Sequence, residues 1–272
     1  MAEFSDEQLE RYARHIVLRE VGGVGQQKLL AARVLVVGAG GLGSPLILYL
    51  AAAGVGTIGI VDFDTVSLSN LQRQIAHRTA DIGRLKVESA ADSAHAINPG
   101  VKIIPHSERL TADNALKILA NYDVVADGSD NFATRFLIND ACFFARKTLV
   151  SAAVTEFDGQ IATYSAWKRE ENVKYPCYRC IFPEPPPPGT APNCSETGIL
   201  GAAAGVVGTL QSLEVMKEIV GLGDSLAGRL LIYDALSAQF RNVRVHPDPA
   251  CNLCGATPRI RDLSIHIREM PV

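Results

Sequence analysis

The sequence of 272 residues lacks the features of several classes of protein. Its charges nearly balance, with a net charge of −3, so the chain as a whole has no electrostatic attraction to nucleic acid or anionic membranes. No apolar run reaches the roughly 18 residues of a membrane span, and the acidic N-terminal stretch is unlike a signal peptide. Six cysteines are too few for a disulfide scaffold. These absences favour a cytoplasmic protein.

Apolar sequence, by contrast, is plentiful. Apolar residues make up 47% of the chain and charged residues 20%, which is enough to build a full core and excludes wholesale disorder. The length suits one large α/β domain. We expect a single domain over 1–272, composed of a helical arm (1–32), a nucleotide-binding part (33–152) and a further part (153–272).

The stretch over 33–64 is the most informative. Val34–Val37 are four consecutive apolar residues, typical of a strand buried on both faces. The turn that follows carries four glycines: Gly38, Gly40, Gly41 and Gly43. We expect Ser44 to cap the next helix, and a second strand to end at Asp62. Such glycines let the backbone approach a phosphate at a helix N-terminus, and Asp62 is spaced to accept from ribose hydroxyls. The motif predicts a nucleotide site without identifying the nucleotide.

The remaining pattern predicts an α/β fold with a Rossmann-like parallel sheet. Helices are expected over 5–20, 26–32, 83–98, 111–120, 132–146 and 199–220. Further strands are expected over 101–105, 122–126, 148–152, 229–233 and 240–245. Residues 159–167 alternate like an antiparallel strand, so the sheet should become mixed there. The proline-rich stretch 183–192 predicts an exposed loop.

Several polar residues fall near the expected phosphate site. Asn70, Arg73 and Lys86 are candidate phosphate ligands, although Lys86 could be a plain surface lysine. Asp130 follows a parallel strand and is a candidate magnesium ligand, or else part of a turn that caps the next helix. Arg14 is either solvated or lent to a neighbouring subunit. This many cations suit a triphosphate better than the single pyrophosphate of NAD.

The cysteines form two C-x-x-C pairs: Cys177, Cys180, Cys251 and Cys254. Four thiolates can hold a closed, structural zinc ion, which would tie the C-terminal part back to residue 180. The alternatives are unrelated buried thiols or one redox pair. Cys142 lies in an apolar helix and is expected in the core. Cys194 precedes a helix start, where a thiolate is stabilised, so it is a candidate reactive thiol.

Taken together, these segments resemble the ThiF/MoeB/HesA family, prokaryotic relatives of ubiquitin-activating enzymes. The similar stretches span almost the whole chain: RYARHIVLREVGGVGQQKL, VLVVGAGGLGSP, IVDFDTVSLSNLQRQ, GRLKVESA, DGSDNFATRFLIND, CYRC, CSETGILG and CNLC. The resemblance is closest to molybdopterin-synthase adenylyltransferases. It implies that ATP and the C-terminal glycine of a ubiquitin-like sulfur carrier give an acyl-adenylate and pyrophosphate.

The resemblance also implies roles for individual residues. The four glycines would line the ATP phosphates, and Asp62 would take the ribose. Residues implied to contact phosphates are Asn70, Arg73 and Lys86, with Asp130 on Mg²⁺. Arg14 resembles an arginine that one subunit of a homodimer contributes to the other. Residues 153–272 would hold the zinc and bind the carrier.

The carrier implied is the molybdopterin-synthase small subunit or the thiamine-pathway carrier, with sulfur supplied by a separate donor protein. Cys194 falls where some relatives link covalently to the carrier or handle sulfur, while others need only the adenylate. Two rival functions stay open at this point. One is an NAD-dependent oxidoreductase, and the other is a non-catalytic scaffold that binds zinc and nucleotide.

Overall fold

An eight-stranded mixed sheet forms the centre of the molecule, in the order β10-β9-β6-β5-β4-β1-β2-β3. The computed structural model describes residues 3–170, 173–187 and 198–267. The five parallel strands are β1 (Arg33–Val37), β2 (Thr57–Val61), β3 (Lys102–His106), β4 (Val124–Asp127) and β5 (Thr148–Thr155). The antiparallel strands are β6 (Asp158–Tyr164), β9 (Arg229–Asp234) and β10 (Gln239–Arg244). The predicted change from a parallel to a mixed sheet is therefore confirmed.

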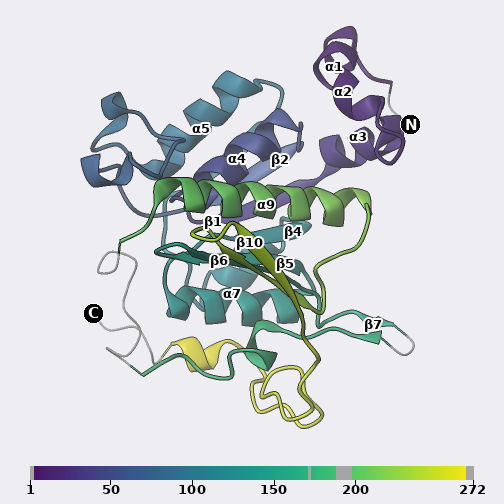
Figure 1. The fold of residues 1–272 in the computed structure, drawn as a ribbon, viewed down its shortest axis with the longest axis vertical. Helices are drawn as coiled ribbons and strands as arrows, with labels where there is room; N and C mark the ends of the chain where they lie inside the picture. Colours follow the sequence, from purple (N-terminus) through teal and green to yellow (C-terminus); the bar gives the residue numbers. More distant parts are fainter. Residues whose placement is uncertain (1–2, 171–172, 188–197, 268–272) are drawn as a thin grey trace.

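Helices cover both faces of the sheet (Figure 1). One layer contains α3 (Gly22–Ala31), α4 (Gly43–Ala52), α5 (Lys86–Ile97) and the long α9 (Gly201–Val220). The other layer contains α6 (Ala115–Leu119) and α7 (Phe132–Ala145). Each layer has its own core, because strand residues alternate between the two faces. Cys142 is buried in the α7 core, as expected. No helix of the described residues is long and apolar enough to cross a membrane.

The N-terminal arm differs from the single helix expected over 5–20. It forms two short helices, α1 (Asp6–Arg11) and α2 (Ala13–Ile16), with Tyr12 between them outside helical geometry. The Tyr12 side chain is buried, and its hydroxyl accepts a hydrogen bond of 2.9 Å from the Asn98 amide. This contact anchors the arm at the C-terminal ends of α4 and α5.

Two local expectations about helix ends are wrong. The helix expected over 26–32 begins earlier, because Gly22, Gly23 and Gly25 lie inside α3. At Gly25 a Cβ atom would come within 2.9 Å of Val220, so this glycine allows α3 to pack closely on α9. Ser44 does not cap α4, because the helix already begins at Gly43. The Ser44 hydroxyl is buried without a partner among the described residues.

Three smaller features complete the described chain. A two-stranded hairpin, β7 (Arg169–Glu170) and β8 (Val173–Lys174), extends from the main sheet. Short 3-10 turns occur at η1 (Leu68–Asn70), η2 (Thr79–Asp81), η3 (Tyr178–Cys180) and η4 (Ser264–His266). Residues 183–187 of the predicted proline loop are free of helix and strand, as expected, and the rest of that loop lies outside the described residues.

Candidate active site and metal centre

A cavity of about 360 Å³ opens at the carboxyl ends of the parallel strands. It lies where the strand order reverses between β1 and β4, which is the usual ligand site of doubly wound sheets. Its walls come from the turn after β1, the end of β2, the N-terminus of α5 and the loop after β4. The volume is within the range of small-molecule sites.

Glycines give the floor of this cavity its shape. Gly38 adopts a φ of +95°, which favours glycine, and its amide donates to the Val61 carbonyl at 2.8 Å. A Cβ atom on Gly43 would lie 1.8 Å from the Gly38 carbonyl oxygen. Gly43 is therefore needed to close the turn, and it lies behind the cavity surface. Gly40 and Gly41 line the cavity itself, together with Gly38.

Asp62 ends β2 beside the glycine turn and lines the cavity. Its two carboxylate oxygens accept from the backbone amides of Ala39, at 2.8 Å, and Asp64, at 2.9 Å. Burial raises the pKa of Asp62, while the positive charge of Lys86 opposes that shift. Asp62 thus fixes the turn after β1 as well as facing the cavity.

Lys86 begins α5 and is almost fully buried. Its ammonium group donates to the Asp64 carboxylate at 2.8 Å, and its side chain is only 8% exposed. A lysine at a helix N-terminus opposes the helix dipole, and the Asp64 carboxylate compensates for it. Lys86 is therefore not a plain surface lysine. The Asp64 side chain is half exposed. A more strongly charged anion that enters the cavity can therefore replace Asp64 as the partner of Lys86.

Of the other predicted phosphate ligands, Arg73 lines the cavity and Asn70 does not. The Arg73 guanidinium donates to the Ser69 carbonyl at 3.1 Å, and its aliphatic part lies against Gly41. The Asn70 side chain instead accepts from the Ser67 amide at 3.1 Å. Asn70 therefore shapes the η1 turn that leads to Arg73.

Asp130 lies in the loop after β4 and lines the cavity with an exposed side chain. The neighbouring Asn131, not Asp130, caps α7 by accepting from the Thr134 amide at 2.9 Å. Among the described residues the Asp130 carboxylate has one hydrogen bond, a long contact of 3.4 Å from the Asn131 amide. Its oxygens are thus available to a cation, and an oxygen donor of this kind suits Mg²⁺.

Buried polar groups hold the Asp130 loop from below. Asp127 is fully buried and accepts from the Ser129 amide at 2.9 Å and from the Ser151 hydroxyl at 2.8 Å. The side-chain amide of Gln211, on α9, donates to the carbonyls of Asp127 and Val150 at 2.8 and 3.0 Å. The loop is fixed to β5 and α9 before any ligand binds.

A second cavity of about 260 Å³ lies over β5 and β6, next to the first. The two cavities share Asp130, Arg135 and Val154. Much of the second lining is apolar and small, including Ala152, Ala153 and Ala162, with Phe132, Ile161, Tyr164, Tyr178, Phe182 and Leu230 around them. The two cavities therefore adjoin at Asp130 and Arg135.

Several cavity residues were not predicted from the sequence. The structure adds Phe63, Asp64, Gln74, Arg109 and Arg135 to the lining. Arg109 lies over the Phe63 ring at 4.2 Å and forms part of the cavity wall. Phe63 and Asp64 could have been predicted from the segment VDFD at the end of β2, because residues just past a parallel strand lie at the edge of the sheet where ligands bind.

Arg14, the arginine predicted to act across a dimer, lies away from both cavities. Arg14 is exposed on α2 and lines neither cavity. The arm packs at the C-terminal ends of α4 and α5, through Tyr12 and Arg11, whereas the nucleotide-type cavity lies at their N-terminal ends. Ten residues of α4 place these two ends about 15 Å apart. Cys194 lies outside the described residues.

The four paired cysteines converge, although 74 residues separate the first pair from the second in the chain. Their sulfur atoms all lie within 4.8 Å of one another, with contacts of 3.4 to 3.9 Å. A tetrahedron with Zn–S bonds of about 2.3 Å has sulfur atoms about 3.8 Å apart. The four thiols therefore fit a closed tetrahedral metal ion and leave no position for a substrate.

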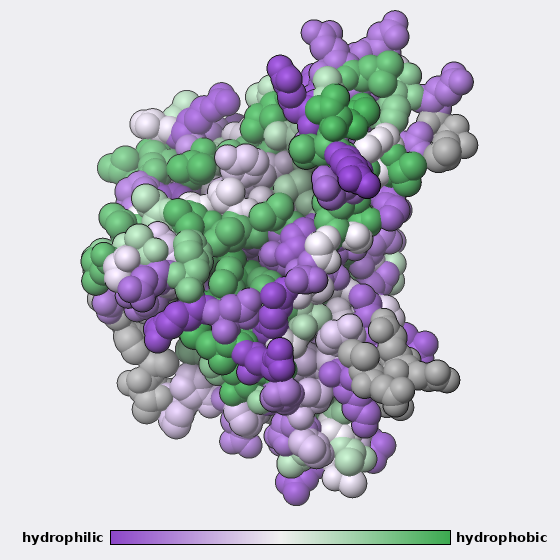
Figure 2. Space-filling view, turned by 45° about the vertical axis from the view of Figure 1, so that its right-hand side comes forward, coloured by the Kyte–Doolittle hydropathy of each residue, from purple (hydrophilic) through white to green (hydrophobic). Residues whose placement is uncertain are grey.

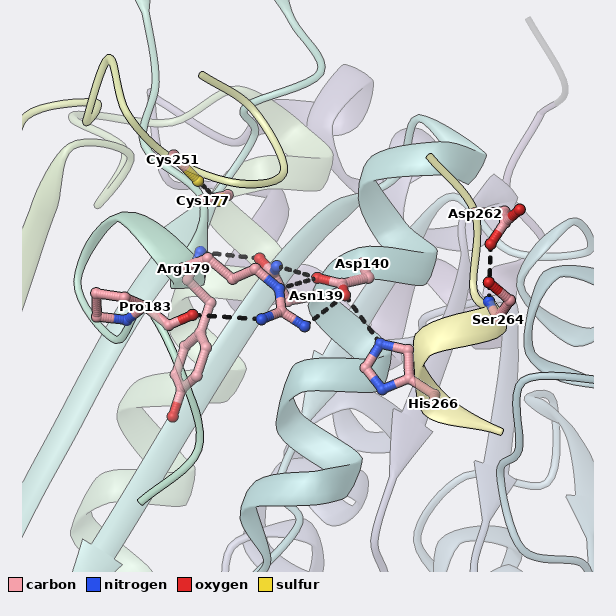
Figure 3. Close-up of polar contacts among 10 residues, drawn as sticks. Asn139, Asp140, Cys177, Arg179, Pro183, Cys251, Asp262, Ser264 and His266 are labelled. Carbon is pink, nitrogen blue, oxygen red and sulfur yellow. Dashed lines mark hydrogen bonds and ion pairs between the residues drawn. The ribbon is translucent and has the colours of Figure 1, made fainter. Parts of the chain in front are cut away.

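A buried charge cluster joins this centre to the rest of the fold (Figure 3). Asp140 of α7 is fully buried and receives two hydrogen bonds, of 2.8 and 2.7 Å, from Arg179, which lies between two of the cysteines. His266 of η4 contacts the same carboxylate at 2.8 Å. The neighbouring Asn139 accepts from the Tyr178 amide at 2.8 Å. The Asp140 carboxylate thus connects α7, the segment 177–180 that carries the first cysteine pair, and the C-terminal segment around His266.

These features define a nucleotide-binding type of α/β protein with a separate cluster of four cysteines that could hold a metal ion. The ThiF family model matches residues 12–253, and the chain belongs to the ThiF family. The resemblance deduced from the sequence motifs is therefore confirmed.

Individual relatives agree with this assignment. The chain is 47% identical over 260 residues to the sulfur carrier protein adenylyltransferase of Thermus thermophilus, covering 96% of each protein. It is 49% identical over 263 residues to the adenylyltransferase and sulfurtransferase MOCS3 of Bos taurus, covering 96% of this chain but 56% of that one. Among solved structures, Escherichia coli MccB superposes with a TM-score of 0.78 at 20% identity, over 93% of this chain and 76% of that one, which shows a shared fold.

Proposed function

We propose that the protein catalyses the ATP-dependent adenylation of a ubiquitin-like sulfur carrier at its C-terminal glycine. One observation carries the proposal: a glycine turn, buried and half-buried cations and an available carboxylate converge on one cavity in a ThiF-family chain. The Thermus thermophilus relative, which matches over nearly its whole length, is named for this activity.

The reaction needs charge stabilisation more than covalent catalysis. A carboxylate oxygen of the carrier attacks the α-phosphorus of ATP, and the bond to the bridging oxygen breaks as pyrophosphate leaves with the electron pair. Arg73 and Lys86 are placed to stabilise the negative charge that develops on the phosphates. Asp62 is placed to accept from the ribose hydroxyls, beside the glycine turn. Asp130 would hold Mg²⁺, which when bound neutralises phosphate charge.

The second cavity supports a carrier whose end is a narrow peptide. Bulky lining residues such as Phe132, Tyr164 and Tyr178 limit the space to a chain without large side chains, such as two glycines, and the cavity adjoins the first one at Asp130. We assign the carrier tail to this cavity. The first candidate for the carrier is the small subunit of molybdopterin synthase, and the thiamine-pathway carrier is the second.

Arg14 supports a homodimer in which each subunit completes the partner's site. The side chain is exposed, has no hydrogen bond or ion pair with any described residue, and lies at the wrong end of α4 to reach its own cavity. Apolar residues are also exposed on α9 and on the β9–β10 hairpin: Val206, Leu213, Leu236, Phe240 and Val243. Figure 2 shows hydrophobic residues gathered on one face of the molecule, where a partner can bury them.

We further assign zinc to the four cysteines as a structural ion. Sulfur is expected to come from a separate donor protein, and the role proposed for Cys194 is confined to events after the adenylate. We also propose that the chain consists of a helical arm (1–32), a nucleotide-binding part (33–152) and a part that binds the carrier and zinc (153–272).

Site variants test these roles. Arg73→Ala and Asp130→Ala should abolish carrier-dependent exchange of radiolabel between pyrophosphate and ATP while the dimer persists in analytical ultracentrifugation. Full exchange by either variant would show that the residue has been misassigned. Cys194→Ala should adenylate normally, and loss of exchange would place Cys194 in the first step.

A further inference from the structure

Arg135 is a buried cation at the junction of the two cavities. It lies in the first turns of α7, is 8% exposed, and lines both cavities. Its guanidinium donates to the Ala152 carbonyl at 2.8 Å and to the Ser129 carbonyl. These two carbonyls belong to β5 and to the loop that carries Asp130. The guanidinium is thus held in place by backbone on two sides of the junction.

Within the part of the chain that the structure describes, the Arg135 cation has no anionic partner. No carboxylate of the described residues lies within 4.0 Å of Arg135, whereas the equally buried Arg179 has Asp140. A buried charge without a counterion is costly, and carbonyl groups offset only part of that cost. The hydrogen bonds to Ala152 and Ser129 also leave part of the five-donor guanidinium without a partner among the described residues. The arrangement is that of a site completed by an anion from outside the chain.

The second cavity indicates which anion this is. Arg135 is the only cationic side chain among the described residues that line it, and Asp130 is the only acidic one. The phosphate side of the first cavity already has Arg73, Lys86 and the glycine turn. An anion that enters through the second cavity meets Arg135 at the junction, beside Asp130, whose charge would otherwise repel it.

We propose that Arg135 binds the C-terminal carboxylate of the carrier tail and orients one of its oxygens toward the α-phosphorus. The proposal rests on the function proposed above and assigns a substrate-binding residue to it. Guanidinium matches a carboxylate with paired hydrogen bonds and stays charged at all working pH values. No proton moves in this step, because the carboxylate is already ionised when it attacks. The two carbonyl contacts fix the guanidinium beforehand, so little ordering is needed on binding.

The test compares two forms of one carrier. The small subunit of molybdopterin synthase is prepared by semisynthesis with either its natural Gly-Gly carboxylate or a terminal carboxamide. Binding of each form is measured by titration calorimetry. The wild type should prefer the carboxylate about 10- to 100-fold, as expected for charge-assisted hydrogen bonds. Arg135→Gln should bind the two forms equally.

Two further variants make the result specific. Arg146→Gln, at the other end of α7, should keep the full carboxylate preference. Arg135→Lys keeps the charge but loses the paired geometry, so its preference should fall at least about 3-fold. A preference that is absent in the wild type, or unchanged in Arg135→Gln, would overturn the proposal. If Arg135→Gln does not fold, an unchanged preference in Arg135→Lys would overturn it equally.

A second readout separates this inference from the proposed function. Carrier-dependent exchange between pyrophosphate and ATP by the wild type tests the function alone. If exchange occurs and Arg135→Gln keeps the carboxylate preference, the function stands and the role of Arg135 fails. If the wild type shows no exchange with Gly-Gly carriers, the proposed function itself fails.

Discussion

Asp140→Asn should be strongly destabilising, because it removes one charge from a buried pair. The Arg179 and Asp140 side chains are 5% and 0% exposed, and the two hydrogen bonds between them are 2.8 and 2.7 Å long. The asparagine amide would also turn a donor toward Arg179 or His266. Breaking a buried ion pair from one side costs about 3–5 kcal/mol. We expect a loss of that size in the free energy of unfolding.

Urea denaturation of the metal-loaded protein measures this loss, followed by the fluorescence of the single tryptophan, Trp167. Asp92→Asn is the matched control, because the pair between Asp92 and Arg84 has the same 2.8 Å distance but is 66% and 41% exposed. That variant should cost less than about 1 kcal/mol. Equal losses in the two variants would refute the argument that burial sets the strength of the Asp140 cluster.

A double-mutant cycle isolates the pair itself. Arg179→Met removes the cation with little change in length, and Asp140→Asn with Arg179→Met removes both charges. Because the second change relieves the unpaired charge left by the first, the double variant should lose less than the sum of the single losses. Strict additivity would show that the two charges act independently.

Three further predictions concern the metal, the glycine turn and His77. Purified protein should contain about one zinc per chain by elemental mass spectrometry, and Cys251→Ser should lower that content and speed hydrogen exchange in 177–180 and 251–267; an unchanged zinc content would contradict the metal assignment. Gly43→Ala should abolish ATP binding, because its Cβ would lie 1.8 Å from the Gly38 oxygen. Gly205→Ala, with nothing within 4 Å of its Cβ, should stabilise the protein by about 0.5–1 kcal/mol, and similar behaviour of the two glycine variants would argue against the turn geometry. Burial lowers the pKa of His77 below its ordinary 6.5, so the unfolded chain binds more protons just below that pH and stability should fall as the pH drops through it. His77→Gln should flatten this dependence in urea titrations at pH 5 to 8, and an unaltered slope would exclude His77 as its source.

Most of the fold was predictable because its strands are distinctive. Strands β1, β2 and β4 are mostly apolar runs that are almost wholly buried, and glycines mark the turn after β1. The errors lie where tertiary contacts override local signals. Gly25 lies within a helix because α9 packs against it, and Tyr12 interrupts the arm because its ring is buried near Asn98.

The candidate site was predictable to the extent that it lies in motifs. Asp62 and Asp130 follow strands, Lys86 begins a helix and Arg73 lies in a recognisable family motif. The structure gathers all four around one cavity. Arg135 could not be deduced in this way. Its position within α7 resembles that of any helical arginine, and only the fold shows that β5 and the β4 loop surround it.

The cluster around Asp140 had no sequence signal either. Its members, Asn139, Asp140, Arg179 and His266, come from three segments that are far apart in the chain. The two C-x-x-C pairs, in contrast, carried their own spacing signal, and their convergence is confirmed. Long-range polar contacts of the first kind become visible only once the topology is known.

Carrier-dependent exchange between pyrophosphate and ATP tests the central claim most directly. With the small subunit of molybdopterin synthase or the thiamine-pathway carrier, the protein should incorporate labelled pyrophosphate into ATP, and deleting the carrier's last glycine should stop it. Exchange that ignores that deletion, or no exchange with any Gly-Gly carrier, would contradict the account.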